Sequence, residues 1–153
     1  MVQQRERMIE VLRGYGSTYG EVGRRFAASL GLHHTDASAV IEILAAEERG
    51  TPLSPARLRE RVGLTAGATS SLLNRLETAG YVIRSHEHSD RRIVTLHSTA
   101  EIQKATDDFF DPLGARIDDV MSKYPEDVLV KLEEFISELR STMEAYVGEK
   151  TDE

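Results

Sequence analysis

Cysteine is absent from this sequence, and its absence removes several kinds of chemistry at once. Disulfide bonds, thiolate metal ligands and cysteine-based redox sensing are all excluded. The sequence also lacks a run of about eighteen apolar residues and a basic-then-apolar segment at its start, so neither a membrane span nor a secretion signal is predicted. We therefore expect a cytoplasmic protein with no membrane partner. Its 153 residues, 40% of them hydrophobic, suit one ordinary domain or two small subdomains and exclude a large catalytic scaffold.

The formal net charge of −7 looks unfavourable for binding nucleic acid, but the charges are unevenly distributed. Residues 53–97 contain seven arginines and four acidic residues, a balance of +3. Residues 98–153 contain six basic and fifteen acidic residues, a balance of −9, and residues 1–52 contribute the remaining −1. The basic middle suggests a face for phosphates, whereas the acidic third is equally well explained by a solvated helical surface.

The spacing of apolar residues in the first third predicts two helices. The first ends near Gly31 and contains several glycines, each of which weakens a helix by up to about 1 kcal/mol relative to alanine. The second begins at Thr35 or Asp36, acting as the N-cap, and stops at Gly50. A helix as rich in glycine as the first is expected to need a partner surface.

Two shorter helices are predicted next, separated by a tight turn. Ser54 is expected to cap the first of them, which ends at Gly63, and Thr65 to cap the second, which ends at Gly80. The apolar side of the second helix is predicted to be buried and consists of Thr69, Leu72, Leu73 and Leu76.

The rest of the chain is predicted to form a hairpin and two long helices. Residues 81–84 and 93–96 read as two strands joined by a polar segment. Ser98 and Glu101 form a capping box for a long helix that Pro112 should kink or break. The last helix begins at Pro125, and its nearly heptad apolar stripe favours packing against a partner helix.

The polar segment of the hairpin contains the sequence RSHEHSDRR, which supports more than one interpretation. His86, His88 and Asp90 would project from one side of an extended strand, as metal ligands do in some zinc hydrolases. A catalytic zinc also needs further ligands and a larger scaffold, and turns favour these polar residues for their own reasons. The segment therefore predicts no catalytic metal site, while adventitious binding of a divalent ion stays open.

The order of elements favours the other interpretation. Two short helices followed by a hairpin with arginines at its tip make a winged helix. Its second helix can enter the major groove of DNA, while the hairpin can place an arginine in the adjacent minor groove. Asp90 would orient the guanidinium of Arg92, although a solvated surface turn explains that pair alone equally well.

The stretch LSPARLRERVGLTAGATSSLLNRLETAGYVIRSHEHSDRRIVTL resembles the winged-helix core of the MarR family of bacterial transcriptional regulators. Its most specific parts are NRLE with the following GYV, and the DRR of the wing, and the resemblance extends over roughly residues 8–147. It implies a mainly α fold with a small β-hairpin wing: a winged helix-turn-helix core flanked by N- and C-terminal dimerisation helices. The implied divisions are a dimerisation helix (1–34), the DNA-binding lobe (35–97), C-terminal helices (98–147) and a frayed tail (148–153).

Carried over by position, the resemblance implies which residues contact double-stranded DNA. The implied recognition-helix set is Thr65, Gly67, Ala68, Ser70, Ser71, Asn74 and Arg75, and the implied wing set is Asp90, Arg91 and Arg92. The sequence departs from strong base readers in one respect, because no Arg or Lys precedes Arg75 in that helix. Base recognition must then depend on hydroxyl groups, on Asn74 or on close approach of the backbone.

The resemblance also implies a homodimer on an inverted repeat, with no catalytic activity, metal or cofactor. Many relatives bind a small aromatic or anionic effector in a crevice between the dimer helices and the lobe. The residues placed to line such a crevice here are Tyr15, Tyr19, Phe26, His33 and His34, for which core packing and an exposed helix start are the alternative explanation. The function implied is a dimeric, sequence-specific repressor that a ligand releases. The competing function is a winged helix that only contacts other proteins, because the fold alone does not determine the function.

Overall fold

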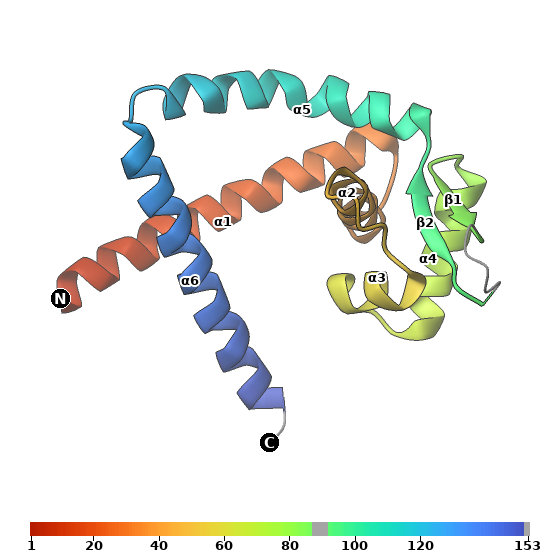
Figure 1. The fold of residues 1–153 in the computed structure, drawn as a ribbon, viewed down its shortest axis with the longest axis horizontal. Coiled ribbons are helices and arrows are strands. Elements are labelled where there is room, and N and C mark those ends of the chain that lie inside the picture. Colours follow the sequence, from red (N-terminus) through yellow and green to blue (C-terminus); the bar gives the residue numbers. More distant parts are fainter. Residues whose placement is uncertain (87–91, 152–153) are drawn as a thin grey trace. The chain divides into compact units, whose positions relative to one another are not determined.

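The computed structural model describes residues 1–86 and 92–151, which form six helices and one antiparallel hairpin (Figure 1). The chain divides into two compact units, Met1–Phe109 and Phe110–Glu153. No helix among the described residues is both long and apolar enough to cross a membrane. The mainly α class with a small hairpin, predicted from sequence, is confirmed.

The first unit begins with α1 (Val2–Leu30) and α2 (His34–Glu48). Gly31 ends α1 with a φ of 64°, a left-handed conformation that a side chain would strain. The predicted start of α2 is wrong, because the N-cap is His33 and its side chain makes no capping hydrogen bond. Asp36 instead lies inside the first turn of the helix and is buried.

The two short helices follow as predicted. They are α3 (Pro55–Val62) and α4 (Ala66–Thr78). The hydroxyl of Ser54 accepts a hydrogen bond from the backbone of Arg57 at 3.2 Å, so it caps α3, and Pro55 occupies the first helical position.

The hairpin consists of β1 (Val82–Ser85) and β2 (Thr95–Ser98), paired from Val82 opposite Ser98 to Ser85 opposite Thr95. The second strand therefore begins two residues later than predicted. The backbone of Leu96 also donates to the carbonyl of Leu53 at 2.8 Å, which ties the segment before α3 to the edge of the hairpin.

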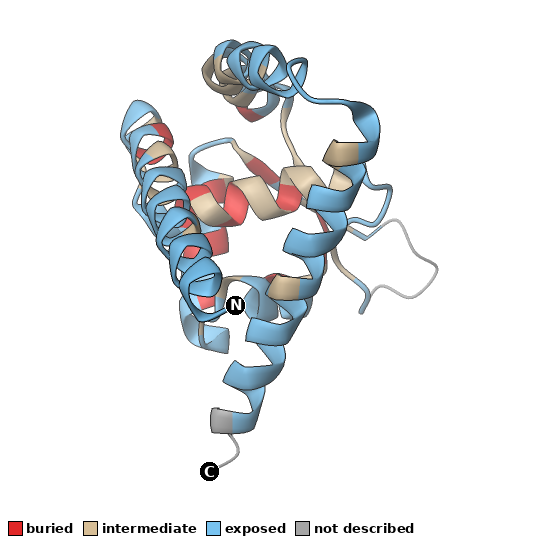
Figure 2. Cartoon of the chain, turned by 90° about the vertical axis from the view of Figure 1, so that its left-hand side faces the viewer, coloured by how far each residue is buried: buried red, intermediate tan, exposed pale blue. Residues whose placement is uncertain are grey.

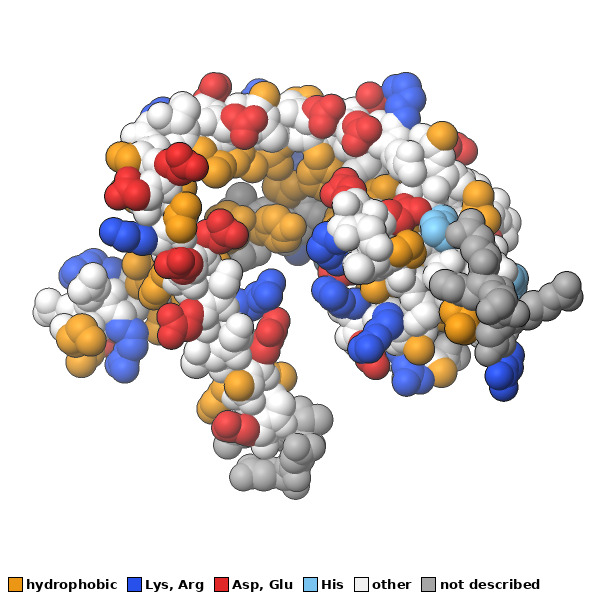
Figure 3. Space-filling view, viewed as in Figure 1, with side chains coloured by type: hydrophobic (Ala, Val, Ile, Leu, Met, Phe, Trp, Pro, Cys, Tyr) orange, Lys and Arg blue, Asp and Glu red, His pale blue; other side chains and the backbone are white. Residues whose placement is uncertain are grey.

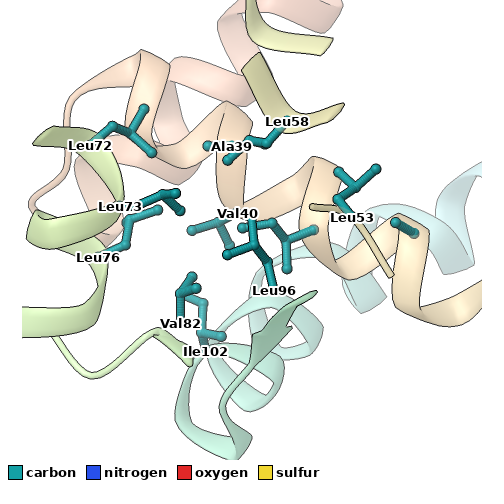
Figure 4. Packing of buried hydrophobic residues seen from close by; sticks show 12 residues of the cluster. Ala39, Val40, Leu53, Leu58, Leu72, Leu73, Leu76, Val82, Leu96 and Ile102 are labelled. Carbon is teal, nitrogen blue, oxygen red and sulfur yellow. The ribbon is translucent and has the colours of Figure 1, made fainter. Parts of the chain in front are cut away.

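One apolar core holds this unit together (Figure 4). Leu72, Leu73 and Leu76 of α4 point toward Val40 of α2 and toward residues of the hairpin and α5. The core consists of Ala39, Val40, Ile43, Ala46, Leu53, Leu58, Leu72, Leu73, Leu76, Val82, Leu96 and Ile102. Its contribution from α4 confirms the predicted buried side of that helix and fixes which side faces solvent.

Helix α5 (Ala100–Met121) differs from prediction at its start. Its cap is Thr99, whose hydroxyl accepts from the backbone of Ile102 at 3.4 Å, whereas Ser98 belongs to β2. Pro112 does not break it. Because Pro112 and Asp108, four residues earlier, are both exposed, water can replace the hydrogen bond that proline cannot donate.

Helix α6 (Glu126–Thr151) starts one residue after the predicted Pro125 and continues past residue 148, so the expected frayed tail is helical up to Thr151. Among residues 110–149, none is buried (Figure 2). Large apolar side chains are nevertheless frequent there, and those with at least 40% of their surface exposed are Ile117, Val120, Met121, Tyr124, Val130, Leu132, Phe135, Ile136, Met143, Tyr146 and Val147. The second unit thus has helices with apolar sides but no interior.

Candidate nucleic-acid interface

The N-terminus of α4 is fixed by a side-chain cap. The hydroxyl of Thr65 accepts a hydrogen bond from the backbone of Ala68 at 3.2 Å, and the carbonyl of Thr65 accepts from the hydroxyl of Thr69 at 2.9 Å. The cap satisfies a backbone donor that would otherwise lack a partner at the helix start. The first turn of α4 is therefore held in a defined orientation while its outer surface stays exposed.

The outer surface of α4 is a continuous polar stripe of small side chains. The residues implied to face the DNA groove are all exposed: Thr65, Gly67, Ala68, Ser70, Ser71, Asn74 and Arg75. The opposite face is buried in the core, with Thr69 only 3% exposed. The structure thus brings this predicted set together on one side of one helix. Basic side chains also gather over the neighbouring α3, whereas acidic ones follow α5 (Figure 3).

Arg75 has a partner that the sequence did not suggest. Its Nε donates to Asp36 Oδ2 at 2.9 Å and its Nη2 donates to Asp36 Oδ1 at 2.8 Å. Asp36 is 2% exposed, whereas the Arg75 side chain is 51% exposed. The hydrogen bonds that Arg75 donates to Asp36 raise the pKa of Arg75. The pair fastens α4 to the start of α2, and it explains why Asp36 is not the predicted cap.

Asn74 is also engaged within the lobe. Arg84 of β1 donates from Nη2 to Asn74 Oδ1 at 3.0 Å, and its Nε lies 3.2 Å from Glu77 Oε1. The Nε and the Glu77 oxygen are not aligned for a hydrogen bond, so that contact is electrostatic. Arg84 is not among the site residues predicted from the sequence. The alternation of β1 could have indicated it, because Val82 is buried and a residue two positions later lies on the same face.

The predicted wing is only partly within the described residues. Arg92 is exposed at the start of the returning segment. Asp90 and Arg91 lie outside the described residues, as does His88, so the pairing of Asp90 with Arg92 stays a prediction. His86 is exposed, and no group of three potential ligands that could hold a metal ion is found in the part of the chain that the structure describes.

A carboxylate anchors the base of the hairpin. Glu47, near the end of α2, accepts hydrogen bonds from the backbone of Ser98 at 3.1 Å to each of its oxygens and a short one from the Ser98 hydroxyl. His97 Nδ1 lies 3.1 Å from the same carboxylate, and its Nε2 lies 3.0 Å from the hydroxyl of Thr95. Strand β2 is therefore joined to α2 by side-chain bonds as well as by the core.

The five residues implied to line a ligand crevice differ in burial and in their aromatic contacts. Tyr15 and Tyr19 stack on each other with ring centroids 6.0 Å apart, and about two thirds of each side chain is exposed. Phe26 is fully buried and packs on Phe109, with ring centroids 5.2 Å apart. The two histidines, His33 and His34, are exposed at the start of α2. Packing against Phe109 accounts for the burial of Phe26. For the other four residues, the ligand crevice stays a prediction.

Similarity to known proteins agrees with this arrangement. Residues 30–93 match the model of the MarR family. The HTH-type transcriptional regulator YcgE of Bacillus subtilis (strain 168) is 31% identical over 136 residues, which cover 89% of this chain and 86% of that protein. Among solved structures, a MarR family protein from Bacillus stearothermophilus aligns over 94% of this chain and 97% of its own, with a TM-score of 0.68 and 17% identity. NadR in complex with 4-hydroxyphenylacetate aligns over 86% of this chain and 89% of its own, with a TM-score of 0.63 and 23% identity.

Proposed function

The chain belongs to the MarR family of DNA-binding transcriptional regulators, and we propose that it binds an inverted-repeat operator as a homodimer and represses transcription from it. The observation that carries the proposal is the polar stripe on α4, which is capped at Thr65, backed by the core and exposed along its length. A helix presented in this way can lie in the major groove with its N-terminal residues against base edges.

The residue types on the stripe define how it would read DNA. Ser70 and Ser71 can donate or accept at base edges, and Gly67 allows the backbone to approach closely. Arg75 is turned toward Asp36, so in this conformation its guanidinium fork is occupied. The exposed Arg92 would supply the minor-groove contact of the wing.

The homodimer rests on apolar surface that each unit leaves exposed. The second unit has no buried residue among 110–149, and its stripe of large apolar side chains is longer than two helices need for each other. Helix α1 likewise exposes Met8, Ile9, Val11, Tyr15 and Tyr19. A second copy of the chain would cover these surfaces, and a two-fold axis would place two α4 helices on half-sites about one helical turn apart.

Release by a small aromatic or anionic ligand completes the proposal. NadR was crystallised with 4-hydroxyphenylacetate, an aromatic carboxylate, and it shares this fold. A ligand that binds better to a dimer with the wrong spacing of recognition helices would lower DNA affinity by its difference in binding free energy between the two states.

The experiment that tests the function uses fragmented genomic DNA from the source organism. The purified protein is incubated with the fragments at near-physiological salt, and the retained DNA is sequenced. Enrichment of a few sites that share an inverted repeat is the expected result. Folded dimeric protein that enriches no sequence, with or without candidate aromatic carboxylates, would instead favour a winged helix that contacts other proteins.

A further inference from the structure

The side-chain amide of Asn74 is already hydrogen-bonded in the DNA-free chain. Asn74 lies on the exposed stripe of α4, and its Oδ1 accepts a hydrogen bond from Arg84 Nη2 at 3.0 Å. Apart from Arg75, which is paired with Asp36, Asn74 has the side chain on the stripe best suited to discriminate between bases, because its planar amide can donate and accept at once. The hydrogen bonds that the amide can still form with DNA therefore depend on Arg84.

The identity of the partner fixes the orientation of the amide. A guanidinium group has only donors, so the atom of Asn74 that faces Arg84 must be the oxygen, and the opposite orientation would place two donors against each other. Arg84 itself is held in place by Glu77, 3.2 Å away, and by its position on β1 two residues after the buried Val82. With only 31% of its side chain exposed, Arg84 has little freedom to move away.

This orientation matters because asparagine usually distinguishes adenine by two simultaneous hydrogen bonds. It donates to adenine N7 and accepts from adenine N6, and the second bond requires Oδ1. Here Oδ1 already accepts from a charged donor, so an adenine amino group could use only the second lone pair of the oxygen, beside the guanidinium. An adenine amino group in that place would also approach a guanidinium cation.

We propose that Arg84 is a positioning residue for specificity, which favours donation by the NH2 group of Asn74 over acceptance by its Oδ1. The inference rests on the proposed reading of bases by α4. With donation from its NH2 group favoured, Asn74 selects a base that presents acceptors in the major groove, namely guanine through N7 and O6 or thymine through O4. Adenine loses its two-bond advantage, and cytosine, which presents a donor, is disfavoured.

The test is a selection of DNA duplexes from a library with a randomised central region, carried out with the full-length chain and its variants. Asn74→Ala first identifies the base position that Asn74 faces, because preference should be lost there and kept elsewhere. Arg84→Met then removes the donor and keeps the apolar stem. The matched control Arg84→Lys keeps a charged donor at the same place.

The expected result is a shift of about tenfold toward adenine at that single position with Arg84→Met, since a good two-bond contact discriminates by about 5- to 160-fold. Arg84→Lys should keep the wild-type preference for guanine or thymine. A loss of stability alone would lower binding to all sequences equally and would not change one base. Unchanged preference with Arg84→Met, or no position altered by Asn74→Ala, overturns the proposal.

Two further outcomes have definite meanings. If thermal unfolding shows that Arg84→Met does not fold, Asn74→Gln serves as the second test of the proposal. This surface change moves the amide one methylene beyond Arg84 and should restore the preference for adenine. An unchanged base there overturns the proposal. If the wild-type chain enriches no sequence at all, the proposed function itself fails, and that outcome is distinct from an altered or unaltered base at one position.

Discussion

Asp36 and Arg75, 39 residues apart, form a two-bond ion pair that joins α2 to α4. The pair is asymmetric, because the carboxylate is almost completely buried while half of the arginine side chain reaches solvent. Removal of either partner therefore has different consequences for stability, and this asymmetry can be measured.

Arg75→Met should destabilise the protein more than Asp36→Asn. Without the arginine, the carboxylate of Asp36 stays buried and unpaired, which costs about 2 to 3 kcal/mol. Without the carboxylate, the arginine can turn into water, so we expect a loss of about 1 kcal/mol. Urea denaturation of both variants measures the difference. Equal losses would mean that burial of Asp36 does not govern the energetics of the pair.

Thr65→Ala should lower the free energy of unfolding by about 1 kcal/mol, because it removes the cap of α4. Ser71→Ala is the matched control, since Ser71 is exposed on the same helix and does not cap it. Thermal unfolding of the two variants compares them directly. A smaller effect of Thr65→Ala than of Ser71→Ala would contradict the role assigned to the cap.

Arg92→Ala should weaken binding to the selected operator by about 1 to 3 kcal/mol and leave the fold and the dimer intact. Lys131→Ala, an exposed change on α6, is the control and should leave affinity unaltered. Fluorescence anisotropy at one fixed salt concentration gives both values. Wild-type affinity in the Arg92 variant would remove the wing from the proposed interface.

Affinity for DNA should fall steeply as salt rises, because arginines of the basic lobe displace counterions from phosphates. The logarithm of the binding constant should decrease linearly with the logarithm of salt concentration, by about 0.9 for each phosphate contacted. A titration between low and physiological salt gives the slope. A flat response would indicate a partner other than DNA.

Phe135→Lys should convert the proposed dimer into a monomer. Phe135 lies on the apolar stripe of α6 and is 41% exposed, so a charge there would be buried only when a second copy is bound. Glu134→Lys introduces the same side chain at the adjacent exposed position and should leave the dimer unchanged. Sedimentation velocity distinguishes the two masses. A dimer that survives Phe135→Lys would place the interface elsewhere.

Local features of the fold could be predicted because their causes lie within a few residues. The caps at Ser54 and Thr65 and the stop at Gly31 depend on neighbouring backbone groups, and all three are confirmed. The buried side of α4 follows in the same way from its apolar spacing. These short-range features together define the orientation of the recognition helix.

Features that depend on distant partners could not be predicted. Asp36 has the side chain of a cap, but it lies within the helix because Arg75, far along the chain, binds it. Ser98 looked like the start of a capping box, yet it bonds to Glu47 and extends β2 instead. The link from Arg84 to Asn74 likewise depends on how the hairpin lies against α4. In each case a polar side chain could bond either to a nearby backbone group or to a residue distant in the sequence. The sequence indicates only the nearby partner.

The carboxylate of Glu47 has a mechanical consequence for the wing. Since Ser98 and His97 are both bonded to it, the base of the hairpin cannot slide along α2 without breaking several bonds together. The hairpin is therefore held at its base, where His97 and Ser98 contact Glu47. A rotation of α2 would therefore turn β2 with it, because Glu47 ties the two elements together at several points.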